Sequence, residues 1–134
     1  LLLTTGRILS QYNVGAQTRR TDNVVWHEED RLEMHPHDAE NRGIRDGEYV
    51  WVKTPTGAQL KVKALVTERV GAGTSFIPFH FSGWWQGKDM LEYYPEGAHP
   101  VVRGEAVNTA TTYGYDAVTM MQETKTTLCQ VAKA

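Results

Sequence analysis

The sequence predicts a mainly β domain, organised as a closed barrel of short strands with one small helix. Two alternating runs of apolar and polar residues, 49–53 and 59–67, are joined by Thr-Pro-Thr-Gly, which is the pattern of a β-hairpin. Other short apolar segments recur between Gly- and Pro-containing turns, and a single segment carries helix-end signals. At 134 residues the chain is long enough for one domain with its own core.

Composition excludes several classes of protein. The formal net charge is −2, so no global basic field favours nucleic acid or an anionic membrane as a partner. No apolar run approaches the length needed to cross a bilayer. The single cysteine, Cys129, rules out an internal disulfide and a cysteine-rich metal site. The opening LLLTT is strand-like and lacks Met, which favours a piece of a longer protein.

The first twenty residues combine a strand with a polar loop. Residues 1–4 have the apolar character of a buried strand, and the loop after them holds Gly6, Asn13 and Gly15. The loop ends in two arginines at 19–20. Glycine allows backbone N–H groups to approach a ligand, and guanidinium groups pair with phosphate through fixed donors. Either a site for a large phosphorylated, nitrogen-rich cofactor or a polar connection between strands fits this pattern.

The segment that follows contains four consecutive polar residues, 27–30, with the sequence His-Glu-Glu-Asp. Neighbouring positions on a strand or loop point in different directions, so these residues are interpreted as solvated side chains and not as metal ligands. A brief strand is expected at 32–34. The two histidines at 35 and 37 flank a proline and share no helical face, so no metal site is expected there either.

A short helix is predicted from Pro36 to Arg42. Proline suits the first turn of a helix, and Asp38 and Glu40 favour its positive end. Gly43 occupies the position of a left-handed cap, where the helix should stop.

In the second strand of the hairpin, one face is apolar and the other carries lysines. Leu60, Val62, Ala64 and Val66 are expected to face the core, which leaves Lys61, Lys63 and Leu65 on a solvated face. A further strand is predicted at 74–81, where an internal proline at 78 indicates a sheet edge or a bulge.

From Ser82 the pattern changes. Residues 82–106 contain Gly, Pro and several aromatics with no clear period, which predicts a long loop. Its Trp84, Trp85, Tyr93 and Tyr94 are expected either to pack on this domain or to cover a surface that faces a missing neighbour. A polar, threonine-rich tail follows at 108–122, and residues 126–131 predict a closing strand.

Two segments resemble a known family. TTGRILSQYNVGAQTRR at 4–20 and LEMHPHDAENRGIRDGEYVWV at 32–52 are similar to the C-terminal dinucleotide-binding domain of the molybdopterin oxidoreductases, the dimethyl sulfoxide reductase family. The first segment is most similar to formate dehydrogenase catalytic (alpha) subunits. The resemblance covers nearly the whole chain. It implies a six-stranded double-psi β-barrel at 1–134, as one domain of a larger subunit.

The resemblance also implies a ligand, a bis(molybdopterin guanine dinucleotide) carrying molybdenum or tungsten, and a 4Fe–4S cluster in the part of the parent beyond this chain. Cofactor binding is assigned to the opening turn and loop, an aromatic pair near the active-site funnel and two tail residues: Thr5, Gly6, Arg7, Gln11, Tyr12, Asn13, Gly15, Thr18, Arg19, Phe79, His80, Asn108 and Lys125. On residue type alone, Phe79 fits a core position equally well, and His80 fits a hydrogen-bonded histidine at a strand end.

The implied reaction is the two-electron oxidation of formate to carbon dioxide. The implied partners are the remaining domains of the same catalytic subunit and its electron-transfer subunits. This chain offers no catalytic residue or metal ligand, so the isolated piece is expected to be inactive.

Two features depart from the family pattern. The stretch TYGYDAVTMMQETK at 112–125 lacks the Asp-Pro pair and the Phe that many relatives have before the lysine, and the insertion at 83–106 is long. These departures leave the electron-transfer partner and the substrate open. Two functions from other classes stay open as well. One is a stand-alone pterin-binding subunit of a formylmethanofuran-dehydrogenase-type complex, and the other is a double-psi barrel that only binds proteins.

Overall fold

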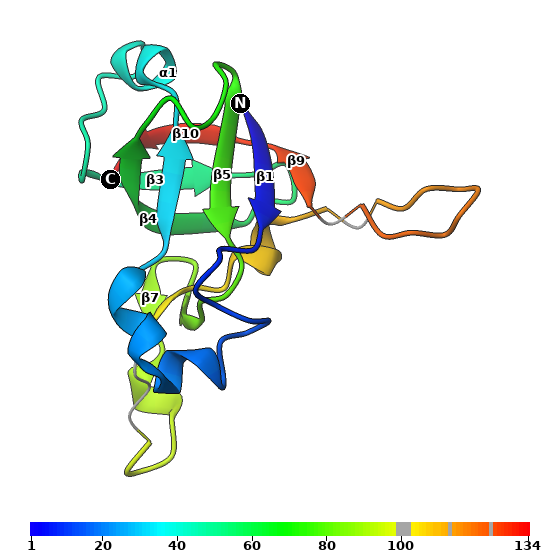
Figure 1. The fold of residues 1–134 in the computed structure, drawn as a ribbon. Coiled ribbons are helices and arrows are strands. Elements are labelled where there is room, and N and C mark those ends of the chain that lie inside the picture. The colour runs from blue at the N-terminus through cyan, green and yellow to red at the C-terminus, as the bar shows by residue number, and fades with distance from the viewer. Residues whose placement is uncertain (99–102, 113, 124) are drawn as a thin grey trace.

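A computed structural model describes residues 1–98, 103–112, 114–123 and 125–134 and confirms the mainly β architecture (Figure 1). Seven strands join in one sheet: β1 Leu2–Gly6, β2 Arg31–Met34, β3 Tyr49–Lys53, β4 Gln59–Val66, β5 Thr74–Pro78, β9 Thr126–Leu128 and β10 Gln130–Lys133. The predicted hairpin is β3 and β4, which pair antiparallel from Tyr49–Lys63 to Lys53–Gln59.

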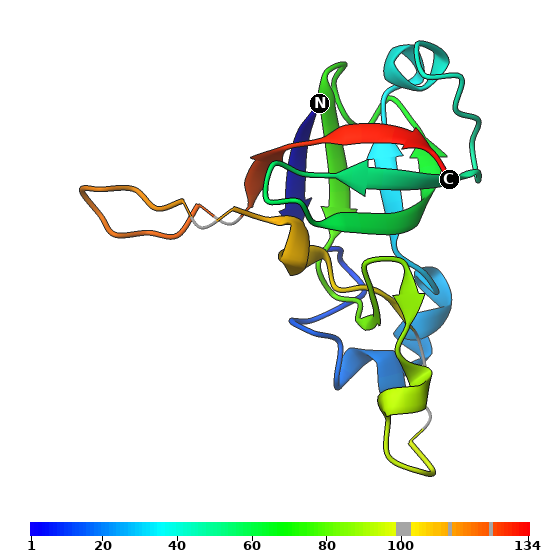
Figure 2. The same ribbon diagram turned by 180° about the vertical axis from the view of Figure 1, so that it is seen from behind.

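The sheet runs in the order β10-β3-β4-β2-β5-β1-β9, so its two edge strands are neighbours in sequence. Only Cys129 separates β9 from β10, and its N–H donates to the Leu1 carbonyl at 2.8 Å. The two edges therefore belong to one continuous segment, and the sheet curls round on itself (Figures 1 and 2). The single closing strand that the sequence predicts is divided at Cys129 into β9, which pairs with β1, and β10, which pairs with β3. This division is why the sheet has seven strands and not the expected six.

Two of the pairings are parallel, and they decide where the loops lie. β1 pairs in parallel with β5, with Gly6 opposite Pro78, and β2 pairs in parallel with β4. The chain therefore leaves β1 and β5 at the same end of the barrel. The predicted strand at 74–81 ends three residues early, at Pro78, although the Phe79 N–H still donates to the Gly6 carbonyl at 3.2 Å.

The barrel interior is filled by alternating aliphatic side chains. Leu60, Val62 and Ala64 of β4 are buried as predicted, whereas Val66, at the end of the strand, is only partly buried. They pack with buried side chains of the other strands: Leu3, Leu32, Met34, Val50, Val52, Ile77 and Val131. This alternation is what a sheet with one dry face requires.

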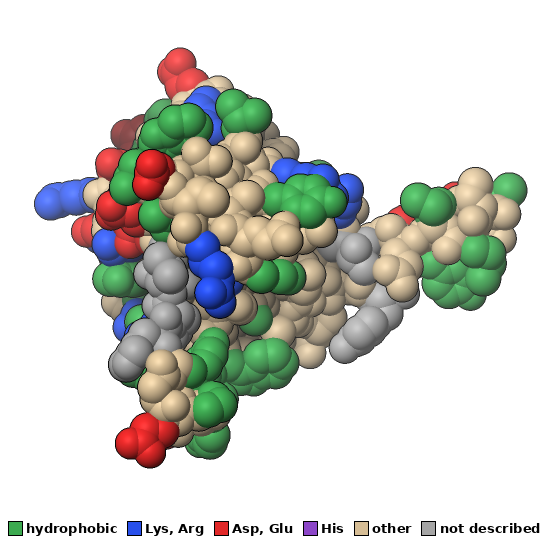
Figure 3. Space-filling view, turned by 60° about the horizontal axis from the view of Figure 1, so that its bottom comes forward, with side chains coloured by type: hydrophobic (Ala, Val, Ile, Leu, Met, Phe, Trp, Pro, Cys, Tyr) green, Lys and Arg blue, Asp and Glu red, His purple; other side chains and the backbone are tan. Residues whose placement is uncertain are grey.

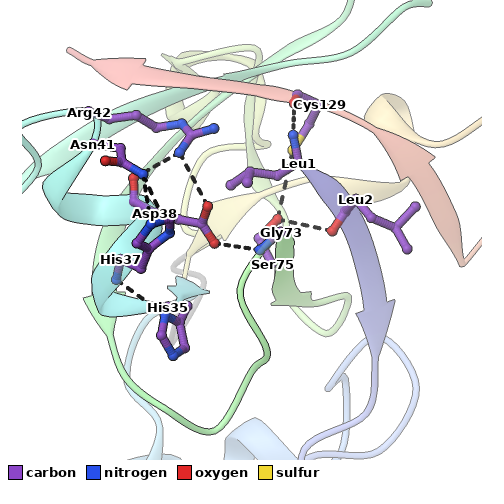
Figure 4. A network of polar contacts seen from close by, with 10 residues as sticks. All are labelled: Leu1, Leu2, His35, His37, Asp38, Asn41, Arg42, Gly73, Ser75 and Cys129. Carbon is purple, nitrogen blue, oxygen red and sulfur yellow. Dashed lines mark hydrogen bonds and ion pairs between the residues drawn. The ribbon is translucent and has the colours of Figure 1, made fainter.

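The helix α1, Pro36–Glu40, covers the end of the barrel that lies away from the opening loop (Figure 1). It is two residues shorter than predicted, although Gly43 adopts the expected left-handed conformation at φ +62°. The Asp38 carboxylate accepts a bond from the Gly73 N–H at 2.7 Å, which ties the helix to the turn before β5 (Figure 4). Arg42 donates to the Asp38 carbonyl at 2.8 Å and secures the same corner.

The predicted long loop at 82–106 was wrong in part, because its described residues contain three short strands and a turn of helix. β6 Gly83–Trp85, β7 Lys88–Asp89 and β8 Gly104–Glu105 form a second small sheet. The part of the chain that the structure describes also contains four 3-10 helices: η1 Thr18–Arg20, η2 Asp22–Trp26, η3 Leu91–Tyr93 and η4 Val107–Ala110. Within the described ranges, no helix has the length and apolar character needed to cross a membrane.

Candidate functional site

The loops that follow β1 and β5 lie together below the barrel, at the end that Figure 3 turns toward the viewer. Most of the residues that the sequence assigned to a cofactor lie on these loops. The parallel pairing of β1 with β5 explains why segments some seventy positions apart in the chain meet there.

His80 is the point where the two loops join. Its side chain is fully buried, its Nε2 accepts a bond from the Ile8 N–H at 3.0 Å, and its Nδ1 bonds to the Asn13 carbonyl. Because Nε2 accepts, the proton of the neutral ring must lie on Nδ1, which donates. Burial lowers the pKa of His80 more than the bond to the Asn13 carbonyl raises it, so the neutral ring is favoured. Arg19 completes the junction by donating from Nη1 to the His80 carbonyl at 3.0 Å.

The sequence left open whether His80 binds a cofactor or is a hydrogen-bonded histidine at a strand end. The geometry fits the second interpretation. Both of its ring nitrogens are engaged by the backbone, so the ring orders the opening loop. Phe79 is partly buried against the barrel core, and its ring lies 4.6 Å from that of His80, centroid to centroid. A direct contact of either residue with a cofactor stays a prediction.

The outer surface of the opening loop is formed by three of the assigned residues. Arg7, Tyr12 and Asn13 are exposed. The Arg7 guanidinium lies 5.6 Å from the Tyr12 ring centroid and donates to the Asn13 side chain at 3.3 Å. The exposed Arg7 side chain makes this one hydrogen bond among the described residues, so a guanidinium with five N–H donors has others to offer an anion.

The inner surface of the same loop contains an unsatisfied amide. Gln11 is 5% exposed, and its Oε1 accepts a bond from the Thr18 hydroxyl at 2.8 Å. Its Nε2 is buried and has no partner among the described residues. Exchanging the two amide atoms would only leave the oxygen unpaired instead. An unpaired buried amide destabilises a fold, so an acceptor from another molecule or chain segment would stabilise this loop.

The remaining assigned residues lie at the same end of the barrel. Gly15 has φ +72° and its carbonyl accepts from the Arg19 N–H at 3.0 Å, so it forms the tight turn that leads into η1. The Thr5 N–H donates to the Lys125 carbonyl at 2.9 Å, which joins the opening turn to the late segment. Asn108 is exposed and belongs to η4, and Figures 1 and 2 show this short helix near the end of β1. The opening turn and the late segment thus share one end of the molecule.

Two adjoining hollows border the opening loop on the outer face of the sheet. One, of about 440 Å³, lies between Ile8, the η2 region and Arg69. The other, of about 530 Å³, extends from Arg69 past Arg7 and Leu9. Between them the Arg69 guanidinium pairs with Glu33 at 2.6 Å.

A third cleft, of about 300 Å³, was missed by the sequence interpretation. It lies beside β4, is lined by Lys61, Lys63 and Arg103, and contains two buried acids, Asp30 and Glu105. The prediction that Asp30 is solvated was therefore wrong: its carboxylate accepts a bond from the Glu105 N–H at 2.8 Å. The face with Lys61 and Lys63 is also only partly exposed, and Lys63 pairs with Glu29 at 2.8 Å.

The acids in this cleft hold the small sheet on the barrel. One Glu105 oxygen accepts from the Lys61 N–H at 2.8 Å and from the Gly87 N–H at 2.6 Å. Its second oxygen is buried without a partner among the described residues, and burial raises the pKa of Glu105. No signal in the local sequence separates such an acid from a solvated one, because its partners are distant in the chain.

Comparisons with known proteins identify the family. A model of the “Molydopterin dinucleotide binding domain” matches residues 1–128. The F420-dependent formate dehydrogenase 2 subunit alpha of Methanococcus maripaludis is 35% identical over 134 residues, which are 99% of this chain and 17% of that protein. The assimilatory nitrate reductase catalytic subunit of Bacillus subtilis is 33% identical over 92 residues, 68% of this chain and 13% of that protein.

Among solved structures, the acetylene hydratase from Pelobacter acetylenicus matches the whole chain with a TM-score of 0.73 and 19% identity, which shows a shared fold. The chain corresponds to 18% of that protein and to between 13% and 17% of the two curated relatives above. The family model and the relative aligned over 99% of the chain agree. This chain is a member of the molybdopterin dinucleotide binding domain family.

Proposed function

We propose that this domain belongs to the catalytic subunit of a formate dehydrogenase and holds a bis(molybdopterin guanine dinucleotide) with molybdenum or tungsten. Three relatives named as alpha subunits of F420-dependent formate dehydrogenases are between 35% and 41% identical to it. The observation that carries the proposal is the convergence of the opening loop and the Thr5–Lys125 contact at one end of the barrel.

The donors at this end fit such a ligand. A molybdopterin dinucleotide is rich in phosphate oxygens and ring nitrogens, which accept hydrogen bonds. The exposed guanidinium of Arg7 and the exposed ammonium of Lys125 suit the phosphates, and the exposed amide of Asn108 suits a heterocycle edge. The unpaired Nε2 of Gln11 supplies a buried donor that needs an acceptor.

The residues of this chain bind and orient the group, whereas the bound metal and pterin supply the two-electron redox chemistry. Arg7, held by Asn13 and Tyr12, presents its remaining donors to a phosphate. His80 keeps the loop in that arrangement through the two backbone bonds of its ring. Replacement of His80 would therefore loosen the loop, but it would not remove a charged side chain that pairs with the ligand.

The similarity to a nitrate reductase makes nitrate reduction the second candidate. Both reactions transfer two electrons at the same kind of cofactor, so the domain itself would bind the ligand in the same way. Substrate preference resides in parts of the parent outside this chain. Formate- and nitrate-dependent dye assays on the full-length protein distinguish the two candidates.

Arg7→Ala and Lys125→Ala in the full-length protein test the binding role. We expect each variant to retain several-fold less molybdopterin and metal, measured as pterin fluorescence after oxidation and by elemental analysis. Arg45→Ala is the matched control, because Arg45 is an exposed arginine in the connection between α1 and β3 and not in the opening loop or the late segment. Unchanged cofactor content in both variants would refute the proposal and favour a protein-binding module.

A further inference from the structure

A segment of the tail extends away from the barrel as a separate arm, made of residues 114–123. Figures 1 and 2 show it from opposite sides, and in both views it lies clear of the sheet. The arm leaves the molecule between η4 and β9, at the same end as the opening loop. The sequence pattern predicts only a polar tail in this region and does not predict a hairpin.

The arm has a defined shape of its own. Tyr115 and Gln122 form an antiparallel bridge, and the Glu123 N–H donates to the Gly114 carbonyl at 2.8 Å. At the tip, the Asp116 carboxylate accepts bonds from the Thr119 N–H at 2.7 Å and its hydroxyl at 2.8 Å. The hydrogen bonds of residues 114–123 in the described structure join arm residues to one another, so this order does not depend on the barrel.

The surface of the arm is unusually apolar for an exposed hairpin. Four of its side chains are large, hydrophobic and mostly exposed: Tyr115 at 58%, Val118 at 91%, Met120 at 68% and Met121 at 68%. Figure 3 shows hydrophobic side chains at several places along the arm. Four exposed, large apolar side chains within ten residues favour an interaction site, and the flexible thioether of methionine adapts well to a partner groove.

We propose that the arm docks into an apolar groove of the same catalytic subunit, in the part of that polypeptide outside these 134 residues. This inference rests on the proposed function. The relative that aligns with 99% of this chain is about six times as long, so most of the surface near the arm in such a protein belongs to its own polypeptide. Attachment to the same chain gives that surface a high effective concentration.

Position and size favour this occupant over a second copy of the chain. The arm emerges beside the Thr5–Lys125 contact, so its partner surface lies next to the proposed cofactor site. A stable dimer interface uses about 20–30 residues on each side, whereas residues 114–123 offer far fewer. The arm therefore acts as a clasp that holds this domain over the cofactor.

Photo-cross-linking in the full-length protein tests the proposal. p-Benzoyl-phenylalanine replaces Tyr115, which is aromatic and exposed, and the cross-linked peptides are identified by mass spectrometry. We expect links to segments of the same polypeptide outside this domain. Links confined to these 134 residues, links to a second copy, or no links would overturn the proposal.

A pair of variants tests whether the contact is apolar. Val118→Asp should expose the arm to limited proteolysis at least several-fold faster in the full-length protein, whereas Val118→Leu should leave the cleavage rate unchanged. Equal rates for both would contradict the docking. Pterin content measured on the same samples distinguishes the proposed function from the docking of the arm. A full-length protein without molybdopterin would refute the proposed function, whereas the cross-links would still show where the arm docks.

Discussion

At the scale of single residues, Asp30 makes the fold sensitive to pH. Burial raises its pKa to about 7 from an ordinary value of 3.8; the Glu105 carboxylate adds to this, and the bond from the Glu105 N–H opposes it. The folded protein therefore binds more protons than the unfolded chain between about pH 4 and pH 7, and stability falls as pH rises through that window. We expect the raised pKa of Asp30 to lower the free energy of unfolding by about 2–4 kcal/mol as pH rises through this window, measured by urea unfolding at each pH.

Asp30→Asn should flatten this dependence, because the amide can still accept the Glu105 N–H bond but does not ionise. Glu28→Gln is the control, since Glu28 is an exposed acid two positions away and should leave the dependence unchanged. An Asp30→Asn variant with the pH dependence of the parent protein would show that the buried carboxyl is not its source.

The same residue shows what the sequence alone does not contain. Asp30 follows two glutamates in a polar run, which is the usual pattern of solvated side chains, yet its partner lies 75 positions later in the chain. His80 was easier to interpret, because a histidine at a strand end has few roles, and a hydrogen-bonded role was among them. Polar burial depends on distant partners, so residue type alone leaves it undetermined.

At the scale of elements, the small sheet depends on the turn at Gly87. This residue has φ +83°, and an added Cβ would lie 2.4 Å from the Trp51 ring. Gly87→Ala should therefore cost about 2–4 kcal/mol, combining backbone strain with displacement of the ring. Urea unfolding measures this cost, and faster proteolysis within residues 83–98 would show that the β6–β7 hairpin has loosened.

Gly57 provides a matched comparison in the β3–β4 turn. Its φ is +85°, nearly the same, but an added Cβ would meet no atom within 4 Å. Gly57→Ala should cost only about 1 kcal/mol, the strain of the left-handed conformation. Similar losses for the two variants would mean that the contact with Trp51 does not hold the small sheet in place.

Local signals account for the elements that the sequence predicted. The β3–β4 hairpin has period-two alternation and a turn sequence, and α1 has a proline at its start and Gly43 after its end. β6, β7 and β8 are only two or three residues long, too short to show any period. They depend on the bond from the Gly87 N–H to Glu105 and on the close approach of Gly87 to the Trp51 ring. Both partners are too distant in sequence for a short sequence pattern to include them.

At the scale of the whole molecule, closure of the barrel depends on β10. This strand pairs with β3 and buries Val131, so a chain that ends at Leu128 leaves the β3 edge unpaired. An unpaired, apolar edge promotes aggregation. We expect the truncated chain to sediment as aggregates and to lose cooperative unfolding.

Val131→Ala is the control for that truncation. It keeps the backbone pairing of β10 and removes only part of a buried side chain, so it should unfold cooperatively with a loss of about 1–3 kcal/mol. A soluble truncated chain with a cooperative transition would show that β10 is dispensable. The sequence predicted a closing strand at 126–131 but not its transfer from β1 to β3, because partner choice is a property of the folded sheet.

The pairing of β1 with β9 joins the start of the chain to residues some 125 positions later. A ribosome releases the opening segment long before its neighbour exists, so Leu2–Gly6 must wait for Thr126–Leu128 to emerge. Through that interval β1 can pair with β5 on one side, but its other edge has no partner. We therefore expect folding to be slow and to be assisted by a chaperone that binds the nascent chain until synthesis is complete.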